Sequence, residues 1–374
     1  MITSVRLLVA FLIPLVISLF VTGLMIDWAP ALGLVDIPNE RKVHTKPIPK
    51  GGGLGIIVGW VLTALWMGLD SADLWVWGGI GSIVLVLGLV DDIRPLPWQL
   101  RLGVQLAAAI AAILLMRAIG TRSSTVPLYL WPAMVLWIVG LTNAFNMLDN
   151  MDALSGGVAW IAAALFAEGT VVDAVTNYAY LGGKIDISLI TAHLMLMGAI
   201  TGFLWFNRPP ARIFMGDAGS TFLGFFFGTS SLVFAGFFDR VGQATHHPET
   251  SNAAFNEFGM FDPGPWALVL CYLAIPWYDL VSVVSIRLYQ GRSPFHADKQ
   301  HLSHRLVALG LSPPWAVGTI CILAAAIGSE GGLLFQQAHH GSIMALVFVI
   351  ACWIALAAFD LVLRARRQII GKSS

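Results

Sequence analysis

Residues 128–157 read "LYLWPAMVLWIVGLTNAFNMLDNMDALSGG", an apolar run that passes directly into a row of amides and carboxylates. The row consists of Asn143, Asn146, Asp149 and Asp152, each three positions after the last. On a helix, residues three apart lie on roughly one face. Packing an apolar helix does not require such a row. Two interpretations therefore remain open: a helix cap at a membrane surface, or a site that binds something charged.

The composition predicts that most of the chain faces lipid or other apolar helices. Of its 374 residues 57% are hydrophobic and 11% are charged, and the mean hydropathy is +0.79. Soluble proteins carry about 25% charged residues. The three cysteines lie in apolar runs without a CxxC or Cys/His cluster, so we expect neither a disulfide framework nor a zinc site. The N-terminal apolar segment continues to Ile26, which favours a first span over a signal peptide.

A helix that crosses a bilayer needs about 20 apolar residues. On this basis the sequence predicts an all-α, polytopic membrane protein with about eleven transmembrane helices, or ten if one of the shorter segments does not cross. The expected spans are residues 7–26, 53–69, 74–90, 102–116, 128–141, 157–172, 187–206, 219–238, 266–286, 315–327 and 343–363. We expect one transmembrane domain over residues 1–374, in which residues 313–374 supply two C-terminal helices and a basic tail.

The basic residues predict the orientation. If the loop at residues 36–50 is cytoplasmic, sixteen of the twenty-one Lys and Arg residues fall on the cytoplasmic face. The N-terminus is then outside and the C-terminus inside. The polar row lies on the same inner face as four other unusual loops, at residues 36–53, 88–101, 206–221 and 289–312. The long outer loop at residues 238–265 shows no comparable pattern, and its role is left open.

Several inner-face residues suit a site for a cation and a phosphate. Asp91 and Asp92 end the third expected span, where carboxylates oppose the helix dipole unless they meet a cation. Asp217 lies in "MGDAGS" before another span, either as a simple N-cap or beside a bound anion. Mg²⁺ prefers one or two carboxylates together with waters and substrate phosphates. The basic residues available to phosphate are Arg208, Arg212, Arg292, Lys299 and Arg305.

Five motifs in order give the chain a family resemblance. They are "DIPNERKVHTKPIPKGGG" (36–53), "GLVDDI" (88–93), "NAFNMLDNMDALSGG" (143–157), "RIFMGDAGSTFLG" (212–224) and "SPFHADKQHLSHRL" (293–306). With these motifs the chain resembles the polyprenyl-phosphate N-acetylhexosamine-1-phosphate transferases, glycosyltransferase family 4. It is most similar to the members that transfer N-acetylglucosamine 1-phosphate to undecaprenyl phosphate. The phospho-MurNAc-pentapeptide transferases of peptidoglycan synthesis are the alternative within the family.

The resemblance implies a reaction and its partners. The phosphate of undecaprenyl phosphate attacks the β-phosphate of a UDP-sugar, UMP leaves, and a lipid-diphosphate sugar that initiates a cell-envelope polysaccharide stays in the membrane. The resemblance also implies a Mg²⁺ cofactor, which Mn²⁺ can replace, and an active site on the cytoplasmic face of the cell inner (plasma) membrane. No nucleic-acid partner is expected. A homodimer is left open.

The resemblance also implies roles for residues of this chain. Asp217 and Asn146 would coordinate the metal, and Asp91, Asp92 and Asp217 would act at the reacting phosphates. The remaining family positions fall into two sets. The nucleotide or sugar side comprises Asn143, Asp149, Asp152, His301, His304 and Arg305, and the phosphate or lipid side comprises Lys42, His44 and Lys46. Asp279 also matches a family position, without an assigned role.

The chain departs from the family pattern at three positions. Asn150 and Ala153 replace the two glycines of a DG-x-DG motif. Because alanine tolerates a positive φ poorly, we expect the turn to be helical through Ala153. Ser303 stands where histidine is usual, which argues against the pentapeptide transferase.

Two further alternatives stay open. A secondary transporter would place ionisable groups near the middle of the membrane, as Asp279 and Asp360 do, but most acids here cluster at one face and no internal repeat is present. For the transfer itself, the lipid phosphate could attack directly, or an aspartate could first form a covalent phospho-enzyme. We favour direct attack, because a phosphate monoester is largely dianionic at pH 7 and needs little help from a base.

Overall fold

The computed structural model describes residues 2–38, 46–68, 75–118, 128–176, 187–245, 263–294, 298–337 and 341–370. Two residues that were expected in the site, Lys42 and His44, lie outside these ranges, as does most of the long outer loop. The described residues form two compact units, Met1–Asp262 and Pro263–Ser374.

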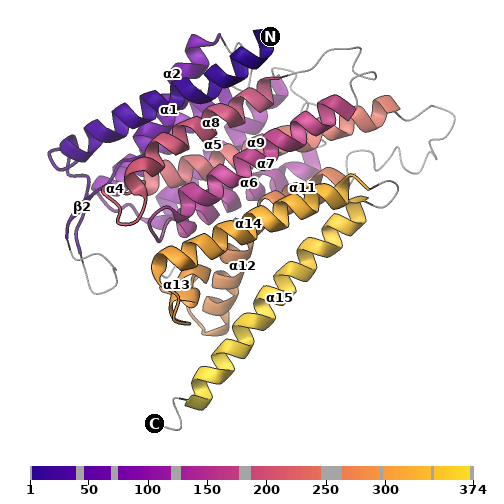
Figure 1. The fold of residues 1–374 in the computed structure, drawn as a ribbon. Coiled ribbons are helices and arrows are strands. Elements are labelled where there is room, and N and C mark those ends of the chain that lie inside the picture. The colour runs from indigo at the N-terminus through magenta and orange to yellow at the C-terminus, as the bar shows by residue number, and fades with distance from the viewer. Residues whose placement is uncertain are drawn as a thin grey trace. The chain divides into compact units, whose positions relative to one another are not determined.

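Helices make up most of the described residues of the first unit (Figure 1). They are α1 (Ile2–Trp28), α2 (Gly53–Trp66), a π-helical turn η1 (Trp75–Ile80), α4 (Gly81–Ile93), α5 (Trp98–Ala118), a 3₁₀ turn η3 (Leu128–Leu130), α6 (Trp131–Leu148), α7 (Leu154–Thr176), α8 (Ser188–Asn207) and α9 (Gly216–Thr245). Two short antiparallel strands, β1 (Val35–Asp36) and β2 (Ile48–Pro49), were not predicted. The second unit contains α11 (Pro263–Tyr272), α12 (Ala274–Tyr289), α13 (Leu302–Val307), α14 (Pro313–Phe335) and α15 (Gly341–Ile370).

The all-α, polytopic fold is confirmed. Among the described residues, nine helices are long and apolar enough to cross a membrane, and a tenth span results if α11 and the adjoining α12 count as one. Counted in this second way, the ten spans of the described residues agree with the lower of the two predicted numbers. The second expected span, residues 53–69, is not among them: it is α2, which at 14 residues is shorter than a bilayer requires. The orientation of the termini stays a prediction.

The expected span at residues 266–286 is a broken helix. Its two parts, α11 and α12, are bent by 75° at Leu273. Pro276 lies in the first turn of α12 and has no N–H to bond the carbonyl of Tyr272, four residues earlier. The proline therefore removes a hydrogen bond that a continuous helix would have at this point.

Helix α9 is the centre of the first unit. Its residues 218–235 are buried, whereas Asp217 in the first turn is partly exposed, and α2, α4, α6 and α7 pack against the helix. Trp60 of α2 and Trp77 of η1 contact Phe226 of α9, with ring centroids 5.9 and 5.0 Å apart. The indole N–H of Trp77 donates to Thr229 Oγ1 at 3.0 Å, so this buried donor is satisfied.

Glycines bring two other helices against the first turn of α9. A Cβ on Gly88 of α4 would lie 2.5 Å from the backbone of Ala218, and one on Gly53 of α2 would lie 2.3 Å from Gly219 Cα. No side chain fits at either position, so backbones touch here. This contact places the carboxyl end of α4, which carries Asp91 and Asp92, beside Asp217.

Candidate active site

Asp217 lies in the first turn of α9 and contacts the polar end of α6. Its Oδ1 accepts a hydrogen bond from Asn146 Nδ2 at 2.9 Å, and the same nitrogen lies 3.2 Å from Ser220 Oγ. Gly216 has φ +77, and a Cβ there would lie 2.4 Å from Asp92 Oδ2. The structure therefore brings together the two residues expected to hold a metal, and glycine is required next to them.

Asp91 is buried and bound on both oxygens. Its Oδ1 accepts the backbone N–H of Leu96 at 2.6 Å, and its Oδ2 lies 2.7 Å from Arg101 Nη1. The same guanidinium nitrogen is 3.7 Å from Asp217 Oδ2. Arg101 thus links two of the three acids expected to act at the phosphates. The acids that end α4 therefore do meet positively charged side chains, as expected for carboxylates at this end of a helix.

Asp92 turns to a different set of partners. Its Oδ2 accepts the backbone N–H of Ala218 at 3.3 Å, and its Oδ1 lies 3.3 Å from Lys50 Nζ. The side chain is only 1% exposed. A carboxylate this deep requires a positive partner, and Lys50 supplies it.

Lys50 is a site residue that the sequence did not single out. It follows β2, and its backbone N–H bonds the carbonyl of Leu34 at 2.8 Å, which closes the β1–β2 hairpin. Its Nζ is 3.5 Å from Asp36 and 3.3 Å from Asp92. Burial lowers the pKa of Lys50, but the negative charges of Asp92, Asp36 and Asp217 outweigh burial and raise the pKa above 10.5. The sequence feature that could have pointed to Lys50 is its position in the motif "KPIPKGGG".

The polar row Asn143, Asn146, Asp149 and Asp152 does not lie on one helical face. Helix α6 ends at Leu148, so only Asn143 and Asn146 lie on it. Asn143 Nδ2 donates to Gln105 Oε1 of α5 at 2.8 Å and to the carbonyl of Val139, so this amide ties α6 to α5. The row is split because the chain leaves the helix before the aspartates.

The two aspartates of the row lie in the turn between α6 and α7. Asp152 Oδ2 accepts the backbone N–H of Ala211 at 2.9 Å and so holds the loop before α9. Asp149 caps the carboxyl end of α6. Burial, together with the negative charges of Asp217 and Asp92, raises the pKa of Asp149 to about 8. The pKa of Asp149 therefore depends in part on the charges of Asp217 and Asp92.

The prediction of a helical turn through Ala153 is wrong. Ala153 has φ +62, the left-handed conformation that the glycine of the family motif would adopt. Alanine in this conformation costs about 1–2 kcal/mol. Hydrogen bonds offset this cost: Ala153 N donates to Asn207 Oδ1, and Asn207 Nδ2 donates to the carbonyl of Ile213, both at 2.8 Å. Asn207 thereby clamps the turn to the loop before α9.

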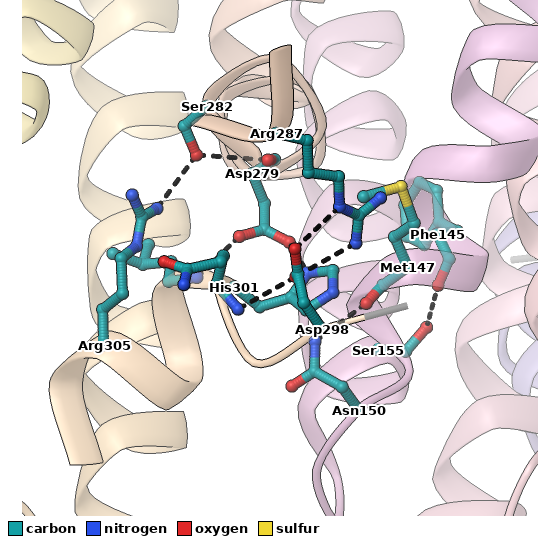
Figure 2. A network of polar contacts seen from close by, with 12 residues as sticks. Phe145, Met147, Asn150, Ser155, Asp279, Ser282, Arg287, Asp298, His301 and Arg305 are labelled. Carbon is teal, nitrogen blue, oxygen red and sulfur yellow. Dashed lines mark hydrogen bonds and ion pairs between the residues drawn. The ribbon is translucent and has the colours of Figure 1, made fainter. Parts of the chain in front are cut away.

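The last motif lies in the second unit, where a buried polar network holds it (Figure 2). His301 precedes α13 rather than lying on it, so it does not share a helix face with His304. The two rings are 6.3 Å apart. His301 Nδ1 lies 2.8 Å from Asp279 Oδ2, and Leu302 N donates to Asp279 Oδ1 at 2.7 Å. Asp279, to which the family resemblance assigned no role, thus contacts both the His301 ring and the Leu302 backbone where α13 begins.

Two further ion pairs hold the loop that carries the histidines. Arg287 binds Asp298 through two nitrogens, at 3.0 and 3.1 Å, and donates to the carbonyl of Pro294. Arg305 pairs with Asp360 and donates to Ser282 Oγ at 2.9 Å. Neither pair was predicted, because the partners are brought together only by the fold. Of the other expected residues, Lys46 is exposed in the loop before β2.

The comparisons with known proteins agree with this arrangement. The family model described as glycosyl transferase family 4 matches residues 74–235. A probable undecaprenyl-phosphate N-acetylglucosaminyl 1-phosphate transferase of Bacillus subtilis is 31% identical over 95% of this chain and 92% of its own length. The chain belongs to glycosyltransferase family 4. Within the family it is also similar to a decaprenyl-phosphate N-acetylglucosaminephosphotransferase of Mycobacterium tuberculosis, at 30% identity over 90% of this chain and 85% of that protein.

A third relative is an undecaprenyl-phosphate alpha-N-acetylglucosaminyl 1-phosphate transferase of Escherichia coli, 28% identical over 86% of this chain and 83% of that protein. The membership that the five motifs predicted is confirmed. The region matched by the family 4 model contains the polar row and all three acids Asp91, Asp92 and Asp217.

Proposed function

We propose that this family 4 protein transfers N-acetylglucosamine 1-phosphate from UDP-N-acetylglucosamine to undecaprenyl phosphate, giving undecaprenyl-diphosphate N-acetylglucosamine and UMP. The observation that carries the proposal is the convergence of Asp91, Asp92 and Asp217 at the first turn of α9. The names of all three relatives support the sugar and a polyprenyl phosphate acceptor, and two of them name undecaprenyl phosphate.

The charges at this point fit a phosphate-transfer site. Three carboxylates meet two basic side chains there, Arg101 and Lys50. A reaction between two phosphates brings further negative charge, so additional positive charge is needed. A divalent cation supplies it, and the residues present suit one.

Asp217 and Asn146 would hold Mg²⁺. A carboxylate and an amide oxygen are ligands of the kind this hard ion prefers, and Mg²⁺ commonly takes its other ligands from water and substrate phosphates. Within the described ranges, no group of three or more His, Cys, Asp or Glu side chains is arranged to hold a metal ion. That result agrees with a shared site and argues against an all-protein cage. When bound, the ion offsets the negative charge of the phosphates.

The protein residues would orient the two phosphates for direct attack. An oxygen of the lipid phosphate forms a bond to the β-phosphorus of the donor while the bond to the UMP oxygen breaks, and UMP leaves with that electron pair. Arg101, which is partly exposed, is placed to bind a phosphate oxygen beside Asp91 and Asp217. Asp91 would orient Arg101 and accept the residual proton of the acceptor.

A two-step reaction through a phosphorylated aspartate has less support. A nucleophilic carboxylate needs an oxygen directed at the donor. Asp92 is 1% exposed and bound to Lys50 and Ala218, and both oxygens of Asp91 accept hydrogen bonds. Either residue would have to give up its partners first.

The multi-pass fold fits a lipid acceptor, and the basic loops favour an active site on the cytoplasmic face of the plasma membrane. Purified protein in detergent, given Mg²⁺ and undecaprenyl phosphate, should release UMP from UDP-N-acetylglucosamine. UDP-MurNAc-pentapeptide tests the alternative, which Ser303 disfavours. Release of UMP only from the pentapeptide donor would show that the protein transfers phospho-MurNAc-pentapeptide and not N-acetylglucosamine 1-phosphate. Uptake of a solute into proteoliposomes without UMP release would favour the transporter.

A further inference from the structure

Gln105 is an amide buried in the apolar helix α5, where it is 5% exposed. Its Oε1 accepts a hydrogen bond from Asn143 Nδ2 of the neighbouring helix α6 at 2.8 Å, which offsets the cost of burying the amide. A pair that only joined the two helices could lie anywhere along their contact. This pair lies one helical turn from Arg101 on α5 and from Asn146 on α6, both of which belong to the candidate active site.

The contacts of Asn143 fix which way its amide points. A backbone carbonyl can only accept, so the atom that lies 2.8 Å from the carbonyl of Val139 is the NH₂ group. The same nitrogen donates its second hydrogen to Gln105, whose facing atom must then be oxygen. Because Val139 lies four residues earlier, Nδ2 points back along α6. The other branch of the amide, Oδ1, is left toward the carboxyl end of the helix, where Asn146 lies. No described residue donates to Oδ1, and the side chain is partly exposed.

Side chains of α5, α6 and α9 form a ring at this point. Arg101 and Gln105 are four residues apart on α5, and Asn143 and Asn146 are three apart on α6, spacings that bring side chains together on one helix face. Asp217 of α9 joins the two rows at one end, since it lies 3.7 Å from Arg101 and 2.9 Å from Asn146. The bond between Gln105 and Asn143 joins them at the other end. Asn143 Oδ1 is therefore a hydrogen-bond acceptor beside the two proposed metal ligands.

The chemistry of Oδ1 limits what it can bind. An amide oxygen only accepts, so it cannot bond an unprotonated phosphate oxygen, which also only accepts. It requires an O–H or N–H group. Mg²⁺ usually keeps several waters when it binds to a protein, and such waters can donate to nearby oxygens. Partners of this outer kind hold the ligands of a metal in place and strengthen its binding.

We propose that Gln105 is a positioning residue of the metal site: it holds the amide of Asn143 so that Oδ1 accepts a hydrogen bond from a water of the bound Mg²⁺. This inference rests on the proposed function, in which Asp217 and Asn146 hold that ion. Gln105 touches neither the ion nor the substrate and acts through Asn143. The role differs from the nucleotide or sugar contact that the family resemblance implied for Asn143.

Substitutions separate positioning from simple joining of the helices. Gln105→Met removes the acceptor and keeps a side chain of similar volume. Asn143→Leu removes the amide that Gln105 holds, and the double variant lacks both groups. Thr142→Val is the matched control. It removes a buried hydrogen bond of the same kind from the preceding residue of α6, between Thr142 Oγ1 and the carbonyl of Ile138 at 2.8 Å.

The first measurement is the binding of Mn²⁺ to protein in detergent, without donor or lipid, followed by the loss of the EPR signal of free Mn²⁺. The folded fraction is taken from gel filtration. We expect Asn143→Leu to raise the Kd about 10-fold or more, and Gln105→Met to raise it at least about 3-fold. The double variant should bind no more weakly than Asn143→Leu, because Gln105 then has no amide to hold. Thr142→Val should match the unsubstituted protein.

Three results overturn the proposal. They are no Mn²⁺ binding by the unsubstituted protein, a Kd within about 2-fold of normal in Gln105→Met, and effects of the two substitutions that add in the double variant. If Gln105→Met does not fold, an unchanged Kd in Asn143→Leu overturns the proposal by itself.

The second measurement is the rate of UMP release at saturating Mg²⁺. With the metal site filled, KM for the UDP-sugar in Asn143→Leu should change by less than about 3-fold. A larger rise in this KM, together with an unchanged Kd for Mn²⁺, would mean that Asn143 contacts the donor itself, and would overturn the proposal. If the variants show the expected Mn²⁺ binding but the unsubstituted protein transfers no sugar phosphate, the proposed function fails while the role of Gln105 in metal binding stands.

Discussion

Asp91 and Asp92 are neighbours in the chain, yet their carboxylates bind different cations. Asp91 Oδ2 lies 2.7 Å from Arg101 Nη1, and Asp92 Oδ1 lies 3.3 Å from Lys50 Nζ. Adjacent side chains on a helix point about 100° apart, which makes this separation possible. Asp91 shares its arginine with Asp217, whereas Asp92 is closed off among Lys50 and the backbone of α9. The two acids are therefore suited to different tasks.

Asp91→Asn and Asp92→Asn should accordingly give different defects. Loss of Asp91 should slow turnover, and higher pH should restore part of it if the residue accepts the proton of the lipid phosphate. Loss of Asp92 should chiefly raise the concentration of Mg²⁺ or lipid that is required, because Lys50 and the first turn of α9 lose their common anchor. The measurement is a pH–rate profile and a Mg²⁺ titration for each variant.

The same variants test direct attack. With donor labelled in its β-phosphate and no lipid present, no label should stay on the protein. Label that is retained, and lost in one of these variants, would establish a two-step reaction. Identical profiles for both variants would leave the chemistry intact and refute the division of tasks.

Asp217→Asn should leave a folded protein with little activity. Substituting a residue that only supports a metal ligand commonly lowers metal affinity or activity about 10- to 100-fold. Loss of a proposed ligand itself should therefore lower activity about 100-fold or more. Asp27→Asn, at an exposed carboxylate near the end of α1, makes the same chemical change elsewhere and should behave like the unsubstituted protein. The rate of UMP release is measured at limiting and saturating Mg²⁺. Activity of Asp217→Asn within a few-fold of normal at both concentrations contradicts the metal assignment.

Lys50→Met should destabilise the first unit. Removing one partner of a buried ion pair costs about 3–5 kcal/mol, and Lys50, with 25% of its side chain exposed, should fall at or below the lower end. The Tm in detergent should therefore drop. Because the loss comes from an unpaired Asp92, the double variant Lys50→Met/Asp92→Asn should be less destabilised than the sum of the single changes. Additive effects would mean that the two side chains do not stabilise each other.

The raised pKa of Asp149 predicts a pH dependence of stability. With a pKa of about 8 in the folded protein against 3.8 ordinarily, the folded state binds a proton more readily than the unfolded state. Asp149 therefore contributes stability at low pH that is lost as the pH rises toward about 8. Asp149→Asn lacks this dependence, so its Tm should rise relative to that of the unsubstituted protein between pH 5 and pH 9. A constant difference in Tm over this range would contradict the raised pKa.

The basic loops predict the N-terminus outside and the C-terminus inside. Cysteines introduced singly at Ser4 and Ser373, in a background without Cys271, Cys321 and Cys352, can be labelled with a reagent that does not cross membranes. Only the cysteine at position 4 should react in intact cells. Reaction of both, or of neither, would place the termini on one side and require an even number of spans.

Much of the fold could be predicted because apolar length alone decides which segments enter a bilayer. The exceptions have local causes. Residues 53–69 looked like a span, but the helix ends at Trp66, and Gly53 is used to contact Gly219. The β1–β2 hairpin was missed, because two-residue strands leave no periodic pattern.

The candidate site could be predicted in its residue types but not in its pairs. The motifs pointed to Asp91, Asp92, Asn146 and Asp217, and the structure joins them through Arg101 and Lys50. Those pairs depend on how α2, α4 and α9 pack against one another, and this packing cannot be read from a single sequence. Ala153 shows the converse error: its preference against positive φ was read correctly, but tertiary hydrogen bonds to Asn207 override it.

The central claim is that this protein moves a sugar phosphate onto a lipid phosphate. It is tested most directly with UDP-N-acetylglucosamine labelled in its β-phosphate, undecaprenyl phosphate and Mg²⁺, using purified protein in detergent. The account predicts that label passes to the lipid in equal amount to the UMP released, and that Asp217→Asn abolishes both together. UMP release without labelled lipid, or no release with any UDP-N-acetylhexosamine from protein shown to be folded, would contradict it.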